Sequence, residues 1–407
     1  MSESSTVNRI TPLRFIAGFG AVSALADLVY EGARSLIGPY LGSLGATAAV
    51  VGVITGAGEA AALVLRIVTG RLADRTGRPW PQTALGYALT VICVPLVALT
   101  GNLLAAGLLY NGERVGKAVR TPARDTMLAH AAAEVGTGRA FGLHKALDQI
   151  GATAGPLLLA AVLALGGDYR LAFGLLLVPG VFALGTLGRL RRQAPDPARW
   201  EPSARLAENK QLRLERRLPA RFWQYAGFTA VTMLGFSTWG LLSYHLSTRQ
   251  LVSPAVVPAY YAAAMAAASV AAIAFGRVYD RIGLRGLLVL PGLAAVTPVL
   301  SFSASWLLCL LGALAWGAAI GIQDSTMRAA VTNLVPAHRR GAGFGTFGAI
   351  YGSAGLIGAV LIGVLYGISI NLTVIVMAAI QLLAFAAFLP LLKRPSAELG
   401  TRPGRGW

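Results

Sequence analysis

A short charged motif occurs twice in this chain and constrains its fold more than any other feature. The first copy, at residues 70–78, reads Gly-Arg-Leu-Ala-Asp-Arg-Thr-Gly-Arg, and the second, at residues 276–285, reads Gly-Arg-Val-Tyr-Asp-Arg-Ile-Gly-Leu-Arg. Both stand between apolar runs, and they are separated by about half of the 407 residues. An internal repeat of this length, marked by a charged turn between long apolar segments, predicts a duplicated membrane bundle instead of a solenoid of short units.

Composition supports the same class of protein. Hydrophobic residues make up 55% of the chain, charged residues only 13%, and the mean hydropathy is +0.63, whereas a soluble domain carries about 25% charged residues. A helix needs about 20 apolar residues to cross a bilayer. Suitable runs lie at residues 14–38, 46–69, 80–100, 103–123, 141–165, 170–189, 221–245, 256–276, 284–302, 305–335, 342–367 and 370–392. We therefore expect an all-α membrane protein with twelve transmembrane helices in two pseudo-symmetric six-helix halves around a central cavity.

The positions of lysine and arginine predict the orientation in the membrane. A formal net charge of +18 would suggest a nucleic-acid partner for a soluble protein. Here the basic residues gather in every second connection, near residues 71–78, 139, 189–221, 277–285, 339–340 and 393–394. The alternate connections carry only Arg170 and Arg249. Under the positive-inside rule this pattern predicts a multi-pass protein of the cytoplasmic (inner) membrane, with both termini in the cytoplasm and no nucleic-acid partner.

A polar central segment separates the two expected halves. We assign residues 1–190 to an N-terminal six-helix half, residues 191–220 to a basic cytoplasmic linker, and residues 221–407 to a C-terminal half with a short cytoplasmic tail. The linker is expected to set orientation and to contact lipid headgroups without touching substrate. Cys93 and Cys309 lie in apolar runs without a CxxC motif or histidine companions, so no disulfide, metal site or cofactor is predicted.

Ionisable residues inside the spans are the first candidates for function, because charges in hydrocarbon persist only where they face a cavity or a partner. Asp27, Glu31 and Arg34 recur at helical spacing and share one face of the first span. No residue of its own helix neutralises Asp27, so its partner is expected from another span. The full set of coupling and cavity candidates is Asp27, Glu31, Arg34, Glu59, Glu113, Arg114, Lys117, Arg120, Asp148, Gln323, Asp324 and Arg328. The competing interpretation of these charges is permanent structural ion pairing.

The repeated motif resembles the signature loop of the major facilitator superfamily, which has the pattern G-x-x-x-D-R-x-G-R between its second and third spans. Residues 70–78 match this pattern, and Leu284 interrupts the second copy. The resemblance implies a gate whose charges latch helix ends together and bias the outward-facing or inward-facing state. The gating residues would be Gly70, Asp74, Arg75, Gly77, Arg78, Asp280 and Arg281.

Two more segments resemble motifs of the same superfamily. Arg114 with Gly116 resembles the fourth-span arginine motif that is associated with proton coupling. Gly151-x-x-x-Gly155-Pro156 is similar to part of the fifth-span antiporter motif. The resemblance implies a secondary transporter that works by alternating access and exports its solute by proton antiport, and it supplies no substrate.

The C-terminal half carries fewer charges in its spans than the N-terminal half. We therefore assign ion coupling to the N-terminal half and much of the substrate shape to aromatic residues of the C-terminal half. These substrate-shape candidates are Trp239, Tyr244, Tyr260, Tyr261, Trp316 and Tyr351. Their competing interpretation is that of lipid-facing or interfacial anchors.

Several functions fit this pattern. Proton-coupled efflux suits buried acids that neutralise a cationic or amphipathic solute, whereas proton-coupled uptake suits Arg114, Lys117 and Arg120 if they receive an anion. A non-transporting receptor or scaffold is a third hypothesis. The sequence contains no evident nucleophile triad, metal cluster or phosphate-binding glycine loop, so neither an enzyme nor an ATP-driven pump is predicted. We expect a monomer that carries a small molecule with H⁺ as coupling ion, and Glu113 is the leading proton carrier because it lies mid-span beside Arg114.

Overall fold

The long apolar runs of the sequence fold as helices. The computed structural model describes residues 10–200, 218–335 and 339–392. Across these ranges the backbone consists of helices joined by short turns and contains no β-strand. The predicted all-α class is confirmed. Most of the expected linker at residues 191–220 falls outside the described ranges.

The N-terminal half begins with a long helix, and its last two elements extend into residues 191–200 of the expected linker. Side-chain oxygens of Thr11, Thr47 and Asn102 accept hydrogen bonds from backbone N–H groups in the first turns of three of its helices, which satisfies donors that a helix start leaves unpaired. The elements are α1 (Pro12–Ser43), α2 (Ala48–Val64), α3 (Arg66–Thr76), α4 (Pro79–Leu96), η1 (Val97–Leu99), α5 (Leu103–Val135), α6 (Thr137–Ala164), α7 (Tyr169–Leu175), α8 (Leu177–Gln193) and η2 (Pro197–Trp200).

The C-terminal half repeats this plan with two interruptions inside expected spans. The elements are α10 (Ala220–Leu234), α11 (Trp239–Thr248), α12 (Val256–Ile282), η3 (Gly283–Leu288), α13 (Val289–Ser301), α14 (Trp306–Ile322), η4 (Gln323–Met327), α15 (Arg328–Leu334), α16 (Arg340–Ile368) and α17 (Ile370–Leu392). The run expected to be one helix at 221–245 breaks between α10 and α11, and the run at 305–335 contains η4, a π-helical turn.

Nine helical runs of the described residues are long and apolar enough to cross a membrane. The expected spans 256–276 and 284–302 lie within a single one of them, Val256–Ser301, because η3 joins α12 to α13. The helix α5 is absent from the nine since charged residues crowd its middle, and α10 and α11 are each too short after the break between them. The count of twelve spans stays a prediction.

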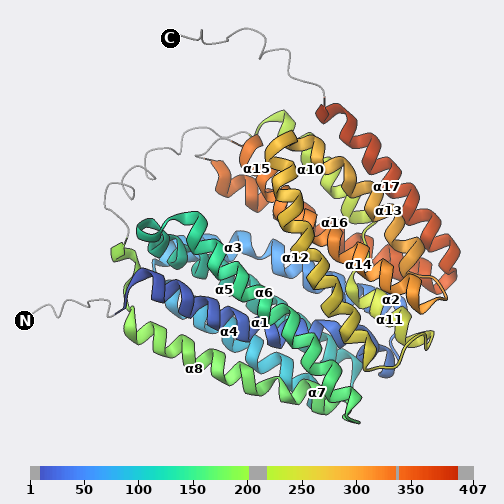
Figure 1. Ribbon diagram of the computed structural model, residues 1–407, viewed down its shortest axis with the longest axis horizontal. Helices are drawn as coiled ribbons and strands as arrows, with labels where there is room; N and C mark the ends of the chain where they lie inside the picture. Colours follow the sequence, from blue (N-terminus) through green and yellow to red (C-terminus); the bar gives the residue numbers. More distant parts are fainter. Residues whose placement is uncertain (1–9, 201–217, 336–338, 393–407) are drawn as a thin grey trace, which may run out of the picture.

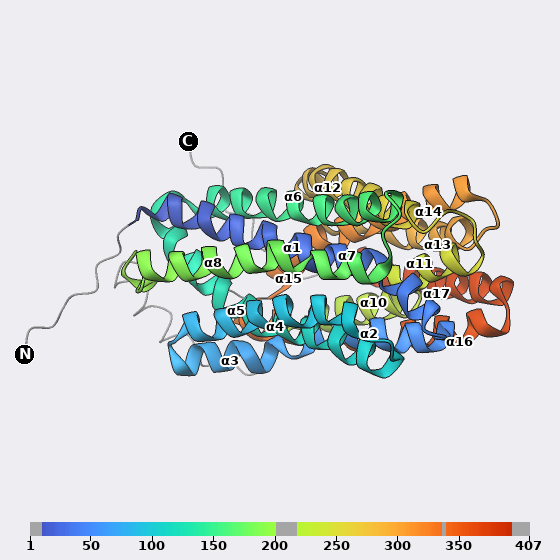
Figure 2. The same ribbon diagram turned by 90° about the horizontal axis from the view of Figure 1, so that it is seen from below.

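The two halves meet mainly along three helix pairs, with smaller contacts of α11 with α2 and of α12 with α1. The helix α2 packs along α16, α1 packs against α11, and α6 packs against α12 (Figures 1 and 2). Close approach at the first pair depends on small residues, because a Cβ at Gly52 or Gly56 would overlap Ala359 of α16. In Figure 1 the start of α1 and the end of α8 lie at the left of the fold, and the end of α17 lies at its top.

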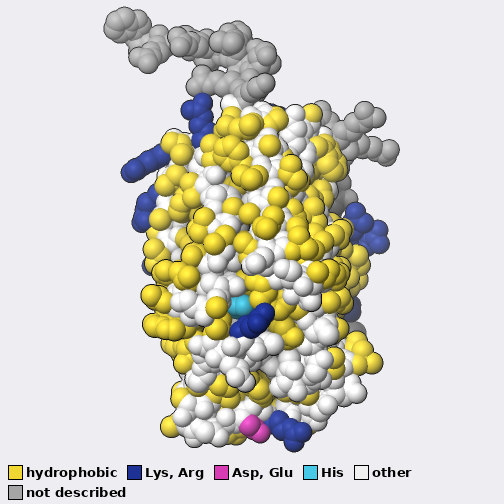
Figure 3. Space-filling model, turned by 90° about the vertical axis from the view of Figure 1, so that its right-hand side faces the viewer, with side chains coloured by type: hydrophobic (Ala, Val, Ile, Leu, Met, Phe, Trp, Pro, Cys, Tyr) yellow, Lys and Arg dark blue, Asp and Glu magenta, His cyan; other side chains and the backbone are white. Residues whose placement is uncertain are grey.

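The outer surface is suited to hydrocarbon. Hydrophobic and uncharged side chains cover most of the face shown in Figure 3, and charged side chains on it are few. On α17, Ile375, Leu382 and Leu383 expose 64%, 70% and 64% of their surface. A contiguous apolar surface of this kind is typical of helices that contact lipid.

Candidate functional site

An ion-pair network joins α1, α2 and α5 in the N-terminal half. Arg34 Nη2 lies 2.9 Å from Glu59 Oε1, and Arg34 Nη1 lies 3.7 Å from Glu31 Oε2. Arg114 Nη1 approaches the same Glu59 oxygen to 3.5 Å. Glu59 therefore lies between two guanidinium groups from different helices, and its side chain keeps 30% of its surface exposed. These four residues were all predicted as candidates, and the fold brings them together.

Glu113 has a more enclosed environment than Glu59. Its carboxylate is 1% exposed, with Arg114 Nε at 2.6 Å from Oε2 and Arg120 Nη1 at 3.8 Å from Oε1. Thr90 on α4 lies 3.5 Å from the same carboxylate and accepts a hydrogen bond of 2.6 Å from Arg120. Two cations thus compensate one buried carboxylate, which is the arrangement that permanent structural pairing requires.

Tyr30 on α1 lies among the cations of α5, and sequence analysis missed it. Lys117 Nζ donates a hydrogen bond of 2.9 Å to the Tyr30 hydroxyl and lies 4.1 Å from the ring centroid. The guanidinium carbons of Arg114 and Arg120 lie 4.9 and 5.6 Å from the same centroid. Cations near an aromatic face are stabilised by its quadrupole. The helical spacing that linked Asp27 to Glu31 also places Tyr30 on this face, and that signal was available in the sequence.

Two carboxyl groups meet where α1 packs on α6. Asp27 and Asp148 are 5% and 9% exposed, and their side chains form a hydrogen bond with each other. Lys145, one turn before Asp148 on α6, places Nζ 2.8 Å from Asp148 Oδ2. The partner of Asp27 does come from another span, but it is a second acid. Because two carboxylates in contact cannot both be ionised at low cost, a pair of this kind is suited to sharing one proton between its oxygens.

Glycines on α6 make this contact sterically possible. A Cβ at Gly151 would overlap the backbone carbonyl of Ala24, and a Cβ at Gly155 would overlap that of Leu28. The four-residue spacing of these glycines keeps them on one face of α6. The Gly151-x-x-x-Gly155 pattern therefore acts here as the surface that brings α6 against α1.

Aromatic residues of the C-terminal half contact α1 across the interface. Trp239, Tyr261 and Trp316 are at most 1% exposed and form one cluster, with ring centroids 4.8, 5.5 and 6.1 Å apart. The Tyr261 hydroxyl donates a hydrogen bond to Glu31, and Trp239 Nε1 donates one of 3.1 Å to the Ser35 carbonyl. These residues close the interface between the halves in this structure.

The other aromatic candidates lie outside this cluster. Tyr244 packs against Tyr366 with a centroid separation of 6.1 Å, and Tyr260 donates a hydrogen bond of 3.0 Å to the Trp306 carbonyl. Tyr351 on α16 instead donates a hydrogen bond of 2.5 Å to Gln323 Oε1. The structure thus separates the six aromatic candidates into a central cluster, a contact to Gln323, and two that lie elsewhere.

The π-helical turn η4 carries polar candidates of the C-terminal half. Gln323 begins the turn, and its Nε2 is buried without a hydrogen-bond partner among the described residues. Arg114 Nη2 on α5 is a second buried donor of this kind. Asp324 is exposed and lies within electrostatic reach of Lys145 from the other half. π-helical turns frequently occur at functional sites. The side chain of Arg328 lies outside the described set.

The repeated motif differs from the loop that the sequence suggested. Residues 70–76 belong to α3, and the chain turns only at Gly77, which has φ +57° and ends the helix. Gly283 also ends a helix, α12, at a positive φ of +60°, but with a different ψ of −140°. Gly70 lies beside Pro122 of α5, whereas Arg75, Arg78, Asp280 and Arg281 are exposed. The side chain of Asp74 lies outside the described set, so the latch stays a prediction.

Comparisons with known sequences identify the family. The sequence model of the Major Facilitator Superfamily matches residues 19–303 and 251–406. An uncharacterized protein of Mycobacterium tuberculosis is 50% identical over 382 residues, which cover 93% of each chain. An uncharacterized MFS-type transporter of Methanocaldococcus jannaschii is 24% identical over 367 residues, which cover 87% of this chain and 89% of the relative.

Solved transporter structures share the fold. A POT family transporter in complex with 5-aminolevulinic acid superposes with a TM-score of 0.75 at 13% identity, covering 94% of this chain and 97% of the other. A bacterial homolog of the human lysosomal transporter Spinster, inward-facing and unoccupied, gives a TM-score of 0.71 at 15% identity, with 95% and 99% covered. The chain is a multi-pass membrane protein that belongs to the major facilitator superfamily, whose members carry out secondary transport by alternating access.

Proposed function

We propose that this protein exports a small solute across the cytoplasmic membrane by proton antiport, as a monomer with both termini in the cytoplasm. The observation that carries the proposal is the contact between Asp27 and Asp148. A buried carboxyl pair is a site that must bind a proton in one state of the cycle, because both groups cannot be ionised while they touch.

The surroundings of the pair explain how the proton would be exchanged. Lys145 Nζ lies 2.8 Å from Asp148 Oδ2, so one cation compensates one negative charge of the pair, and the second carboxyl would need a proton or a cationic solute. Other charged or titratable groups near the pair are Lys117 and Tyr30, Glu31, Arg124 and His144. When α6 moves relative to α1, or a cationic solute approaches Asp27, ionisation of both acids becomes favourable and the proton leaves. Solute and proton then compete for the same carboxylates, which is the requirement for antiport.

Glu113 is a weaker candidate for the proton site than this pair. Its carboxylate already faces Arg114 at 2.6 Å and Arg120 at 3.8 Å. Protonation would leave two buried guanidinium groups with less compensation, at a cost typical of broken buried pairs. We therefore assign Glu113 to holding α5 in register with α4, and the carboxyl pair to coupling.

Infrared spectroscopy tests the proton site without a known substrate. Wild-type protein should show the C=O band of a protonated carboxylic acid that persists at neutral pH. Asp27→Asn should remove this band, because Asp148 then keeps Lys145 as its cation and has no second carboxyl with which to share a proton. Glu134→Gln, on an exposed acid of α5, is the matched control and should leave the band unchanged. A band that survives in Asp27→Asn and Asp148→Asn alike would refute the assignment.

Proton flux in respiring inverted vesicles tests the direction of coupling. Tetraphenylphosphonium and ethidium are suitable organic cations, and benzoate is a suitable organic anion. Antiport predicts that a transported compound releases protons from the acidified lumen in vesicles with wild-type protein, and that Asp27→Asn abolishes this release. The Glu134→Gln control should behave like wild type. Substrate movement without any proton movement would contradict coupling altogether.

Proton-coupled uptake is the second candidate, and one observation favours it. Arg114 Nη2 is buried and has no hydrogen-bond partner within the part of the chain that the structure describes, although Arg114 contacts Glu113 and Glu59 through its other nitrogens. A donor of this kind suits a solute oxygen, such as that of a carboxylate. Symport predicts that an organic anion and protons move across the membrane in the same direction. Arg114→Lys should weaken binding of the anion, because lysine lacks the planar, bidentate donor arrangement of a guanidinium group.

A further inference from the structure

A large pocket lies away from the charged network, at the end of the N-terminal half where α8 ends. Its volume is about 1130 Å³, and it lies between the α3–α4 turn, α5 and the α8–η2 connection. Its lining includes Arg78 and Trp80 at the α3–α4 turn, and Arg191, Arg192 and Asp196 at the end of α8 and beyond it. Neither the coupling site nor the aromatic cluster contributes to this pocket.

The lining is strongly basic. Arg78, Arg191 and Arg192 are exposed and come from two different sides of the pocket. The acid of the lining, Asp196, already forms an ion pair with Arg199, whose Nε lies 3.0 Å from Asp196 Oδ2. The pocket therefore presents an excess of positive charge, and guanidinium groups match the geometry of phosphate oxygens.

The walls of the pocket are rigid. Proline occupies Pro79 and Pro81 on one side and Pro195 and Pro197 on the other, and each fixes its own backbone φ angle. Trp80 is 6% exposed and donates its indole N–H to the Ala194 carbonyl at 3.2 Å, which ties the α4 start to the α8 end. The backbone segments that carry the three arginines are therefore held in place before a ligand binds.

The surrounding surface indicates where such a ligand comes from. Leu72 on α3 is 51% exposed, and Val181 and Phe182 on α8 are 57% and 64% exposed, so apolar surface suited to hydrocarbon continues along both helices that border the pocket. A basic site at the end of lipid-facing helices lies at the depth of the lipid headgroups. Charge complementarity and this apolar continuation both fit an anionic lipid.

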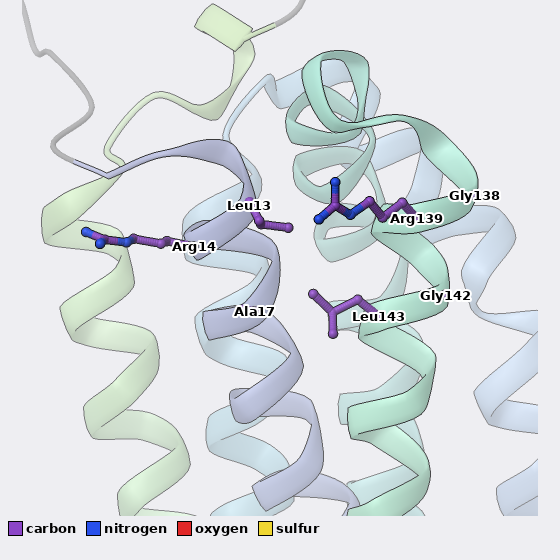
Figure 4. A pocket seen from close by; sticks show the side chains of 7 residues that line it. All are labelled: Leu13, Arg14, Ala17, Gly138, Arg139, Gly142 and Leu143. Atoms are coloured by element: carbon purple, nitrogen blue, oxygen red, sulfur yellow. The ribbon is translucent and has the colours of Figure 1, made fainter.

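A second, smaller pocket has fewer inward-facing arginines than the large pocket and serves as a comparison for phosphate binding. It has a volume of about 650 Å³ and lies between the starts of α1 and α6 (Figure 4). Arg139 and Leu13 face each other across this gap, whereas Arg14 points away from it. One inward-facing arginine offers much less to a phosphate than the three of the large pocket.

We propose that the large pocket binds the phosphate headgroup of an anionic phospholipid, with Arg78, Arg191 and Arg192 as its ligands. The bound phosphate would join the α3–α4 turn, which carries the repeated motif, to the segment that begins the central linker. Lipid binding would therefore stabilise the arrangement of these two segments seen here and make the protein sensitive to the lipid composition of its membrane. This proposal does not depend on the direction of transport or on the coupling ion.

Thermal unfolding of the purified full chain in neutral detergent tests the proposal. Dioleoylphosphatidylglycerol should raise the unfolding temperature saturably, because a ligand that binds the folded state stabilises it, while dioleoylphosphatidylcholine should not. In Arg191→Gln/Arg192→Gln the apparent affinity for phosphatidylglycerol should fall by about tenfold or more, as expected for lost charged hydrogen bonds. The control Arg277→Gln/Arg285→Gln removes two exposed arginines outside the pocket and should keep the wild-type response.

Three outcomes would overturn the proposal. These are equal stabilisation by both lipids, an unchanged phosphatidylglycerol response in Arg191→Gln/Arg192→Gln, and competition by millimolar glycerol 3-phosphate, which would identify a soluble phosphate compound as the occupant. If the double variant does not fold, Arg192→Gln alone and Arg192→Lys replace it. Arg192→Gln should then weaken binding of phosphatidylglycerol more than Arg192→Lys does. If both variants bind phosphatidylglycerol with the wild-type affinity, the site is refuted.

Discussion

The hydroxyl of Tyr261 donates a hydrogen bond to the carboxylate of Glu31, and this bond joins α12 of the C-terminal half to α1 of the N-terminal half. Glu31 also lies 3.7 Å from Arg34, which pairs with Glu59. The aromatic cluster and the ion-pair network are therefore in direct contact. A change in the charge of Glu31 alters a bond between the two halves, because a hydrogen bond to an ionised acceptor is stronger than one to a neutral acceptor.

Tyr261→Phe should weaken the closed interface between α1 and α12 while preserving its packing against Trp239. Loss of a hydrogen bond to a charged group costs about 1.5–3 kcal/mol, which shifts the equilibrium between the closed and opened interface by tenfold or more. Spin labels at Ser43→Cys and Thr248→Cys, in a background without Cys93 and Cys309, should report longer distances in the variant. Tyr260→Phe is the control, since Tyr260 bonds within its own half. An unchanged distance distribution in Tyr261→Phe would show that the bond does not hold the interface.

The pair Arg34–Glu59 should behave as a coupled unit in unfolding experiments. Arg34→Gln alone leaves Glu59 with one ion-pair partner within 4 Å among the described residues, Arg114 at 3.5 Å, so the single variant should be less stable than Arg34→Gln/Glu59→Gln. The coupling in a double-mutant cycle is expected at about 0.5–3 kcal/mol. Additive changes in the free energy of unfolding would mean that solvent compensates the pair.

Gly77 and Gly283 should respond differently to asparagine. Gly77 has φ +57° and ψ +18°, a left-handed conformation that asparagine tolerates, whereas Gly283 has φ +60° and ψ −140°, which is nearly restricted to glycine. Alanine at either position should cost about 1–2 kcal/mol. Asparagine should recover much of that loss at Gly77 and little at Gly283. Thermal unfolding of the four variants checks this, and equal tolerance of asparagine at both sites would contradict these backbone angles.

The proposed orientation predicts opposite accessibility for two exposed positions. Asn102→Cys, in the turn before α5, should react with an impermeant maleimide added to intact cells. Gly341→Cys, at the start of α16, should react only after the membrane is opened. Both require a background in which Cys93 and Cys309 are replaced. The reverse pattern would invert the assigned topology.

The general fold could be predicted from the sequence because it depends on length and hydropathy. The run at 370–392 begins at the same residue as α17, and it contains no charged residue. The break before Trp239 and the π-helical turn at Gln323 could not be predicted in this way. Both depend on tertiary contacts, such as the Trp316 indole that donates a hydrogen bond of 2.9 Å to the Ser237 carbonyl freed by the break.

The sequence indicated many of the charged residues that the structure brings together, but it indicated neither their pairing nor the part of Tyr30. Helical spacing grouped Asp27, Glu31 and Arg34 correctly on one face. It could not show that Asp148 would lie against Asp27, because that contact depends on how closely α6 approaches α1. Nor does spacing along α5 reveal that Glu113 is enclosed by two guanidinium groups, because Arg114 and Arg120 reach it through side-chain conformations that the sequence leaves open.

The concentration of charge on α5 has a consequence for biogenesis. A charged residue near the centre of a helix costs about 2.5–3.5 kcal/mol to insert into a bilayer, and the middle of α5 holds Glu113, Arg114, Lys117 and Arg120 within two turns. The counter-charge Glu59 and the hydroxyl of Tyr30 reside on α2 and α1, which are synthesised first. During translation α5 would therefore leave the translocon only when it can pack against these earlier helices. The ion-pair network of the mature protein would then also set the order in which the helices of its N-terminal half assemble.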